Sequence, residues 1–330
     1  MTDKPSPVHL GEAPDLSPGH NTFRILSLSG GGYRGLFTAL ILEDLERQAG
    51  KPLRQVFDLI TGTSIGGILA TGLSLEVPAN DLVKALCTHG EQIFPKQRLK
   101  KARQLMTSLY AARPLEQAIR AILPHDHARN FASLPGDLLI TAVSKTLGQP
   151  RLLGTGRFAG DGAGLTVTQA LLATAAAPTY FPPLVYKGQS YIDGGLIANA
   201  PDLVALTETL NHTAHPLNDL WMLSIGTVAA DIAEAGDPAT TAMGAARWLT
   251  TQHLFDVTLT AQEQLAVSQA GQLLNNRYLR IDPKPSQKQA KVIGLDRADE
   301  VATNTLRQLA EEAIRSTRDT NGQLLGRLLH

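Results

Sequence analysis

Short apolar runs alternate with longer segments whose apolar residues recur at helical spacing along most of the chain. The apolar runs have the length of buried strands and lie at residues 23–28, 56–60, 138–143 and 220–225. The helical pattern is found at residues 36–48, 65–73, 81–87, 165–177, 202–210, 242–274 and 298–317. Strands that alternate with helices predict parallel strands joined by crossover helices. We therefore expect an α/β fold, a three-layer α/β/α sandwich with a mainly parallel central sheet.

The N-terminus and two extended stretches complete this pattern. Residues 1–21 are polar and contain several prolines, which predicts a flexible tail without its own fold. Residues 184–192 resemble a hairpin, and residues 277–281 resemble an edge strand. The composition does not change between residues 22 and 320. We therefore expect one domain over residues 22–330 that includes the C-terminal helices.

A serine between two glycines lies where the second strand meets its helix. The segment Gly-Thr-Ser-Ile-Gly contains Gly62, Ser64 and Gly66, and its position between a strand and a helix is typical of a nucleophile elbow. The glycines leave room for a sharp turn, and the helix N-terminus favours the negative charge that develops during acyl transfer. A serine N-cap on a core helix explains the same residues equally well.

Three consecutive glycines form the preceding junction between a strand and a helix. Gly30, Gly31 and Gly32 expose backbone N–H groups without side chains, which suits an anion. The anion could be a nucleotide phosphate or the oxyanion of a tetrahedral acyl intermediate. The loop lacks a clean Gly-x-Gly-x-x-Gly start and a following P-loop lysine, which makes the nucleotide less favoured. A turn that only connects two elements is the third interpretation.

A serine nucleophile needs a base, and Asp193 is the favoured candidate. It follows an extended stretch and precedes Gly194 and Gly195. None of the nine histidines lies in a short loop directly after a predicted strand, where a hydrolase histidine is expected. His212 and His215, beside a helix end, are the most plausible histidines for the alternative of an α/β-hydrolase esterase.

Composition limits the remaining function classes. The formal net charge is zero, so nucleic-acid binding is not indicated. Cys87 is the single cysteine, which excludes an intrachain disulfide and a cysteine-clustered metal site. No apolar run is long enough to span a bilayer and no secretory signal is evident, so we expect a cytoplasmic protein. The basic and apolar residues at 96–103 favour a solvated helix face over a membrane contact or a lid.

Five short motifs, in order, resemble those of the patatin-like phospholipases. They are GGGYRG at 30–35, GTSIG at 62–66, AAAPTYFPP at 175–183, DGGLIANAP at 193–201 and LSIGT at 223–227. The resemblance covers residues 23–282, and five motifs in order are far more specific than any one of them. Two residues depart from the family pattern: Ser29 stands where aspartate is usual, and Ala200 where asparagine is common.

The resemblance implies a lipid acyl hydrolase with a patatin-like fold and without a metal or other cofactor. Ser64 and Asp193 would form a catalytic dyad, with Gly62, Gly66, Gly194 and Gly195 shaping the two motifs. Gly30, Gly31 and Gly32 would supply the oxyanion hole. Arg34 is grouped with them, either to hold the loop or to meet the lipid phosphate, and a structural salt bridge is its alternative role. The implied substrates are membrane phospholipids, reached by peripheral contact with the inner membrane.

Two segments, FRILSLSGGGYRGLF and FDLITGTSIGGILA, also resemble bacterial patatin-like effectors of anti-phage systems. This subfamily implies activation by a cyclic dinucleotide, so we expect a protein that is nearly silent on lipid until that ligand is added. A nucleotide-binding module without hydrolase activity stays as an alternative, and the sequence leaves the oligomeric state open.

Overall fold

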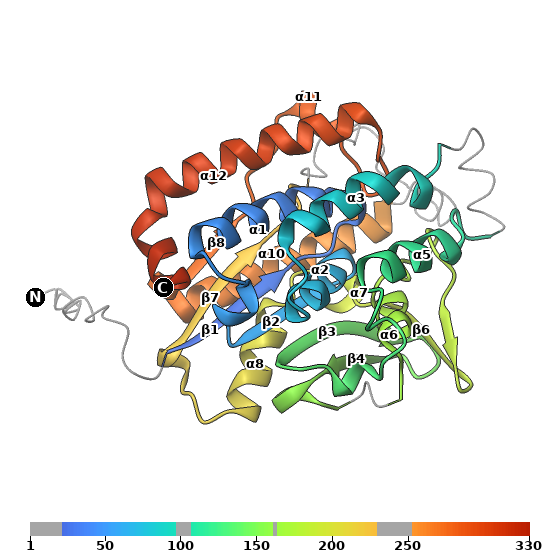
Figure 1. Ribbon diagram of the computed structural model, residues 1–330, viewed down its shortest axis with the longest axis horizontal. Coiled ribbons are helices and arrows are strands. Elements are labelled where there is room, and N and C mark those ends of the chain that lie inside the picture. Colours follow the sequence, from blue (N-terminus) through green and yellow to red (C-terminus); the bar gives the residue numbers. More distant parts are fainter. Residues whose placement is uncertain (1–21, 97–106, 161–163, 230–252) are drawn as a thin grey trace, which may run out of the picture.

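A computed structural model describes residues 22–96, 107–160, 164–229 and 253–330 (Figure 1). The predicted tail at residues 1–21 and most of the basic stretch at 96–103 lie outside these residues. Within the described ranges, no helix combines the length and the hydropathy that a membrane span requires.

Eight strands form one sheet in the order β5-β6-β3-β2-β1-β7-β8, with β4 paired to β3. Their bounds are β1 Phe23–Leu28, β2 Leu59–Thr63, β3 Asp137–Ser144, β4 Gln149–Gly154, β5 Leu184–Tyr186, β6 Gln189–Asp193, β7 Leu220–Ile225 and β8 Tyr278–Ile281. Strands β3, β2, β1, β7 and β8 are parallel, whereas β4, β5 and β6 pair antiparallel. The sheet is therefore mainly parallel, as predicted.

The helices run between these strands and after them. The α-helices are α1 Gly35–Ala49, α2 Ile65–Ser74, α3 Ala79–Ile93, α5 Ala112–Ile122, α6 Val167–Thr174, α7 Gly195–Ala198, α8 Asp202–His212, α10 His253–Leu274, α11 Gln287–Ala290 and α12 Glu300–Leu329. Short 3₁₀ turns are η1 Gly32–Arg34, η2 Leu53–Gln55, η3 Phe131–Ser133, η4 Gly156–Phe158, η5 Leu217–Asp219 and η7 Asn275–Arg277.

Alternate residues of β1 face two separate cores, one on each side of the sheet. Leu26 and Leu28 belong to the larger core, together with buried side chains of α1, α2, α3 and α12. Phe23 and Ile25 belong to the smaller core, which α8 and α10 cover. Because side chains of a strand point alternately to its two faces, the sheet is covered on both sides. The predicted three-layer α/β/α sandwich is confirmed.

Strand β3 brings the ends of β2 and β6 together. It pairs with β4 along one edge from Leu139 to Ser144, so β2 and β6 share its other edge. On that edge Thr141 pairs with Thr63 of β2, and the next residue, Ala142, pairs with Asp193 of β6. The two strands run in opposite directions, and their final residues therefore meet. This register places Ser64, which follows β2, beside Asp193.

Several predicted bounds are wrong. The second strand spans Leu59–Thr63 rather than residues 56–60, because its hydrogen-bonded register with β1 extends through Gly62. The predicted helix at 165–177 ends at Thr174, and the one at 298–317 continues to Leu329. Residues 242–252 of another predicted helix lie outside the described residues, and α10 begins at His253.

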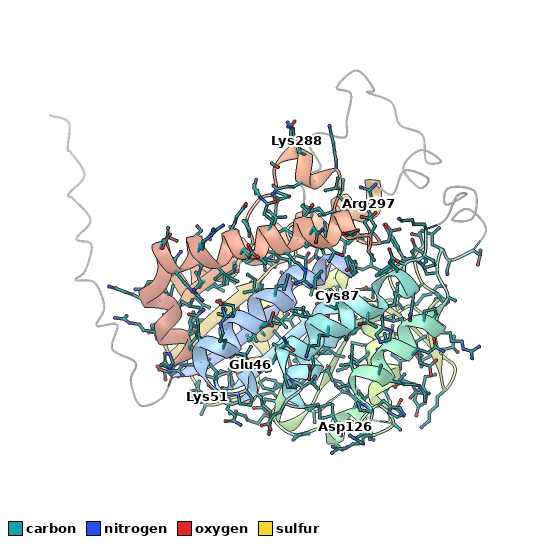
Figure 2. The ribbon with its side chains drawn as sticks, turned by 45° about the horizontal axis from the view of Figure 1, so that its top comes forward. Glu46, Lys51, Cys87, Asp126, Lys288 and Arg297 are labelled. Carbon is teal, nitrogen blue, oxygen red and sulfur yellow. The ribbon has the colours of Figure 1, made fainter. Side chains whose placement is uncertain are left out.

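The C-terminal helix α12 lies along α1 and closes the larger core (Figures 1 and 2). Leu306 and Leu309 of α12 are buried in that core. At one end Asp44 of α1 accepts hydrogen bonds from the Arg318 guanidinium at 2.7 and 2.8 Å. In Figure 2, Cys87 lies on the neighbouring helix α3, where it is half-buried beside Arg307.

Candidate active site

Ser64 occupies a strained backbone position between β2 and α2. Its φ of 56° and ψ of −123° lie in a region that residues with a side chain rarely adopt. The turn is stabilised by Thr174, whose Oγ1 accepts a hydrogen bond from the Ser64 N–H at 2.9 Å and donates one to the Thr141 carbonyl at 2.6 Å. The side chain of Ser64 makes no capping hydrogen bond to α2. The N-cap interpretation therefore lacks the contact that would support it.

The glycines on either side of Ser64 are required by close backbone contacts. A Cβ at Gly62 would overlap the carbonyl oxygen of Gly66, and a Cβ at Gly66 would overlap the carbonyl oxygen of Leu28. The helix therefore starts directly against β1 and β2. This is the geometry of a nucleophile elbow, which holds the serine at the carboxyl edge of the sheet.

Asp193 is buried beside Ser64, with 3% of its surface exposed. Its Oδ1 accepts a hydrogen bond from the Gly195 N–H at 2.7 Å. Burial raises the pKa of Asp193 to about 7, although the hydrogen bonds from Gly195 and from the Ser64 hydroxyl each lower it. Gly194 is required here because a Cβ would overlap Thr141. The carboxyl group is therefore poised to take up or release a proton near neutral pH.

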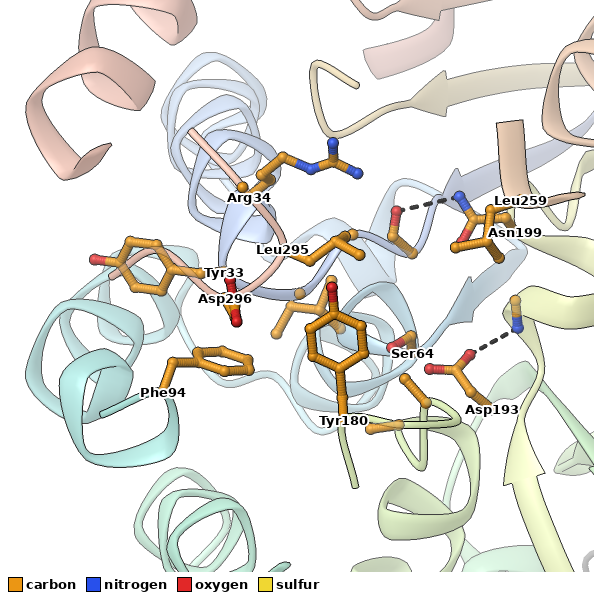
Figure 3. Close-up of a pocket in the computed structure, with 18 of the residues that line it drawn as sticks. Tyr33, Arg34, Ser64, Phe94, Tyr180, Asp193, Asn199, Leu259, Leu295 and Asp296 are labelled. Carbon is orange, nitrogen blue, oxygen red and sulfur yellow. Dashed lines mark hydrogen bonds between the residues drawn. The ribbon is translucent and has the colours of Figure 1, made fainter. Parts of the chain in front are cut away.

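Ser64 and Asp193 open into a cavity of about 420 Å³ (Figure 3). In the figure, the Ser64 hydroxyl and the Asp193 carboxylate point toward one another next to Tyr180. The wall beyond them is largely apolar and includes Ile68, Leu86, Ile93, Phe94, Leu115 and Phe181. This shape suits a hydrophobic chain whose polar end lies beside Ser64.

The glycine loop forms another part of the cavity wall, and its structure changes one expectation. The N–H of Gly30 donates to the Asn199 carbonyl at 2.9 Å. The prediction that this N–H is an oxyanion donor is therefore wrong, because the group is already occupied. Within the described residues, the N–H groups of Gly31 and Gly32 have no acceptor. Gly32 has a φ of 57°, and a Cβ there would overlap the carbonyl oxygen of Leu295. The donors left in this loop are therefore those of Gly31 and Gly32.

Arg34 lines the cavity but does not face the serine. In Figure 3 its guanidinium points away from Ser64 and Asp193. The prediction that groups Arg34 with the oxyanion donors is therefore not supported by its orientation.

The two candidate histidines lie at the opposite end of the sheet from Ser64. The His215 ring packs 5.0 Å, between ring centroids, from Phe23, which begins β1. The His212 ring packs at 5.8 Å from Phe158. Because β1 and β2 are parallel, Ser64 lies beyond the far end of both strands. Ser64 and these histidines therefore lie at opposite ends of the strands, too far apart for a direct proton transfer. The alternative of an esterase that uses His212 or His215 is wrong.

With this geometry established, comparison with known proteins identifies the family. The family model described as patatin-like phospholipase matches residues 26–206. The chain belongs to this family. This chain is 36% identical over 299 residues to a protein of Pseudomonas aeruginosa (strain BWHPSA011 / Pa011) named "cGAMP-activated phospholipase", and the match covers 88% of both chains. A protein of the same name from Escherichia coli (strain TW11681) is 32% identical over 313 residues, covering 86% of both chains. A third, from Vibrio cholerae serotype O1, is 36% identical over 233 residues, covering 63% of this chain and 65% of that one.

Membership confirms the predicted resemblance, the fold class and the class of enzyme. Several residues that hold the elbow and the glycine loop in place were not predicted from the sequence. Thr174, Asn199 and Thr227 all contact the elbow or the glycine loop. Asn199 and Thr227 are part of motifs that the sequence displays, but no local pattern shows that they reach Gly30. Among the described residues, no three histidine, cysteine, aspartate or glutamate side chains gather as metal ligands would.

Proposed function

We propose that this patatin-like phospholipase hydrolyses acyl esters through a Ser64–Asp193 dyad. The observation that carries the proposal is the pairing of a serine on a strained elbow with a buried carboxyl group whose pKa is about 7. A carboxylate with an ordinary pKa is a weak base, whereas one with a pKa near the working pH transfers protons efficiently. Both groups open into the same largely apolar cavity.

The reaction proceeds in two acyl-transfer steps. Asp193 accepts the hydroxyl proton as Ser64 Oγ attacks the ester carbonyl, and the oxyanion is stabilised by the N–H groups of Gly31 and Gly32. Asp193 then donates the proton to the leaving alkoxide, which departs as a lysophospholipid. Water attacks the acyl-serine, Asp193 accepts its proton, and collapse of the intermediate returns that proton to Ser64 Oγ. The fatty acid is released and both residues are restored.

The apolar cavity supports a lipid as the substrate. The walls around Phe94 and Phe181 are hydrophobic and adjoin Ser64, so an acyl chain gains free energy by leaving water there. The proposed substrates are membrane phospholipids, which the protein reaches by peripheral contact with the inner membrane. We expect no nucleic-acid partner and no metal or other cofactor.

We further propose that a cyclic dinucleotide activates the enzyme, as part of antiviral defence. The support is the name shared by three bacterial relatives, cGAMP-activated phospholipase, at 32–36% identity. Fatty-acid release from phospholipid vesicles, measured with and without a panel that includes cGAMP, tests this. We expect release to rise strongly with one cyclic dinucleotide, and full activity without any of them would contradict it.

The dyad is tested separately by labelling with a fluorophosphonate, which reacts with activated serines. We expect an adduct on Ser64 by mass spectrometry, no adduct in Ser64→Ala, and strongly slowed labelling in Asp193→Asn. Each protein is labelled with and without cGAMP. The absence of an adduct from the wild-type protein in both conditions would support the alternative of a binding module without hydrolase activity.

A further inference from the structure

A largely buried arginine contacts the residue that begins the glycine loop. Arg280 of β8 donates from Nη1 to Ser29 Oγ at 2.9 Å and to Ser224 Oγ at 2.8 Å. From Nη2 it donates to Glu263 Oε1 and to Asp282 Oδ2, both at 2.7 Å. Only 13% of its side chain is exposed. The guanidinium is therefore fixed by several partners, one of which is the residue that begins the loop.

Glu263 of α10 continues the network to the other side of the loop. Its second oxygen, Oε2, accepts a hydrogen bond from Asn199 Nδ2 at 2.6 Å. The Asn199 carbonyl accepts the Gly30 N–H at 2.9 Å, and its Nδ2 lies 3.4 Å from the Gly30 carbonyl oxygen (Figure 3). The Thr227 hydroxyl donates to the same carbonyl at 3.0 Å. Gly30 is thus held at both its N–H and its C=O.

Arg280 and Glu263 form an ion pair within this network. Burial by itself lowers the pKa of Arg280, but the carboxylates of Asp282, Glu263 and Asp202 outweigh it, and the pKa is raised. The guanidinium is therefore permanently charged. A buried ion pair of this kind contributes little net stability because desolvation offsets the attraction. The charge-assisted hydrogen bonds from Arg280 to Glu263 and Asp282 instead fix the geometry of these side chains.

We propose that Glu263 and Arg280 are positioning residues that hold the glycine loop in the geometry needed for oxyanion stabilisation. Arg280 acts through Ser29, which precedes Gly30, and Glu263 acts through Asn199, which hydrogen-bonds to Gly30. The N–H groups of Gly31 and Gly32 follow directly in the chain and depend on this anchor. The inference rests on the proposed function, since it assigns these N–H groups to the oxyanion.

The first test is Glu263→Gln, which keeps the size of the side chain and removes the charge that fixes Arg280. We expect kcat for ester hydrolysis and the labelling rate of Ser64 by a fluorophosphonate to fall together by roughly 10- to 100-fold. KM is expected to stay within about twofold, because the lost interaction acts only in the transition state. All rates are measured with and without cGAMP, and thermal melting shows whether each variant is folded.

A second variant and a matched control keep the outcome decisive. Ser29→Ala removes only the hydrogen bond between Arg280 and the loop, and we expect both rates to fall about threefold to tenfold. Arg318→Ala removes a partner of the buried Asp44 on the far side of α1. It is expected to lower the melting temperature and to leave both rates unchanged.

Each result has a distinct meaning. If wild-type Ser64 reacts while Glu263→Gln and Ser29→Ala react at the wild-type rate, the positioning role is overturned. A rise in KM with an unchanged kcat would also overturn it. If Glu263→Gln does not fold, Ser29→Ala decides alone. If wild-type Ser64 does not react with or without cGAMP, the proposed function itself fails.

Discussion

At the scale of single residues, the central feature is the burial of Asp193. A carboxylate in water is a weak base for a serine hydroxyl, but burial raises the pKa of Asp193 to about 7. The hydrogen bonds from the Gly195 N–H and the Ser64 hydroxyl orient the carboxylate but do not stabilise its charge enough to cancel that effect. The same residue therefore serves as base and then as acid in the proposed reaction.

The pH dependence of hydrolysis follows from this pKa. Below a pH of about 7, Asp193 is protonated and cannot accept the serine proton, so kcat/KM should fall about tenfold per pH unit. The measurement is kcat/KM on a water-soluble ester between about pH 5 and pH 9. An acid limb centred near the ordinary value for aspartate would contradict the role of burial.

The same pKa predicts how Asp193→Asn changes stability. The pKa of Asp193 is about 7 in the folded protein against 3.8 as its ordinary value, so its contribution to stability is present at low pH and is lost as the pH rises through about 7. The shift corresponds to roughly 4 kcal/mol in the free energy of unfolding as an upper value. Asp193→Asn should therefore be more stable than wild type at about pH 8, and this gain should shrink at about pH 5. Urea unfolding at both pH values measures the difference, and an equal difference at both would contradict it.

At the scale of elements, the active-site geometry depends on how closely α2 approaches β1 and β2. Ser64 is held in a strained conformation because the helix begins immediately against the sheet. The glycines at 62 and 66 permit that approach. The motif is visible in the sequence for the same reason, since only glycine fits where backbone meets backbone.

A single methyl group tests this contact. In Gly66→Ala the new Cβ overlaps the Leu28 carbonyl oxygen, which is rigid backbone, so we expect a loss of at least about 2 kcal/mol in the free energy of unfolding. Gly326→Ala is the control, because a Cβ there meets no atom within 4 Å and α12 should gain up to about 1 kcal/mol. Denaturant unfolding measures both, and equal effects of the two substitutions would refute the account of the elbow.

Strands and helices whose apolar residues recur at a clear spacing could be predicted from the sequence, and those without such a spacing could not. The units around Leu28 and Ser64 combine an apolar strand, glycines and an apolar helix, and both were identified in order. Strand β4 was missed because Pro150 and exposed polar residues give it the appearance of a loop. Helix α5 was missed because it is short and carries Pro114 in its first turn, which weakens its helical pattern.

At the scale of the whole molecule, the site is built from residues far apart in the chain. Ser29 and Arg280 are separated by 251 positions, and Gly30 and Asn199 by 169. The candidate dyad could be predicted because Ser64 and Asp193 each lie in a distinctive motif. The use of the Gly30 N–H by Asn199 could not, because a sequence shows no hydrogen bond between distant segments.

The C-terminal helix is an integral part of this molecule. Leu306 of α12 is fully buried in the larger core, so Leu306→Ala should lower the free energy of unfolding by about 2–5 kcal/mol. Val301 on the same helix is 59% exposed, and Val301→Ala should change it by no more than about 0.5 kcal/mol. Equal effects in thermal or denaturant unfolding would indicate that α12 is only loosely appended.

The most direct test of the account is fatty-acid release from phospholipid vesicles in the presence of cGAMP. Four proteins are compared: wild type, Ser64→Ala, Asp193→Asn and the double variant His212→Ala/His215→Ala. We expect Ser64→Ala and Asp193→Asn to lose activity by a factor of about 100 to 10,000, and the double variant to keep the wild-type rate. Full activity of Asp193→Asn, or loss of activity in the histidine variant, would contradict the Ser64–Asp193 dyad.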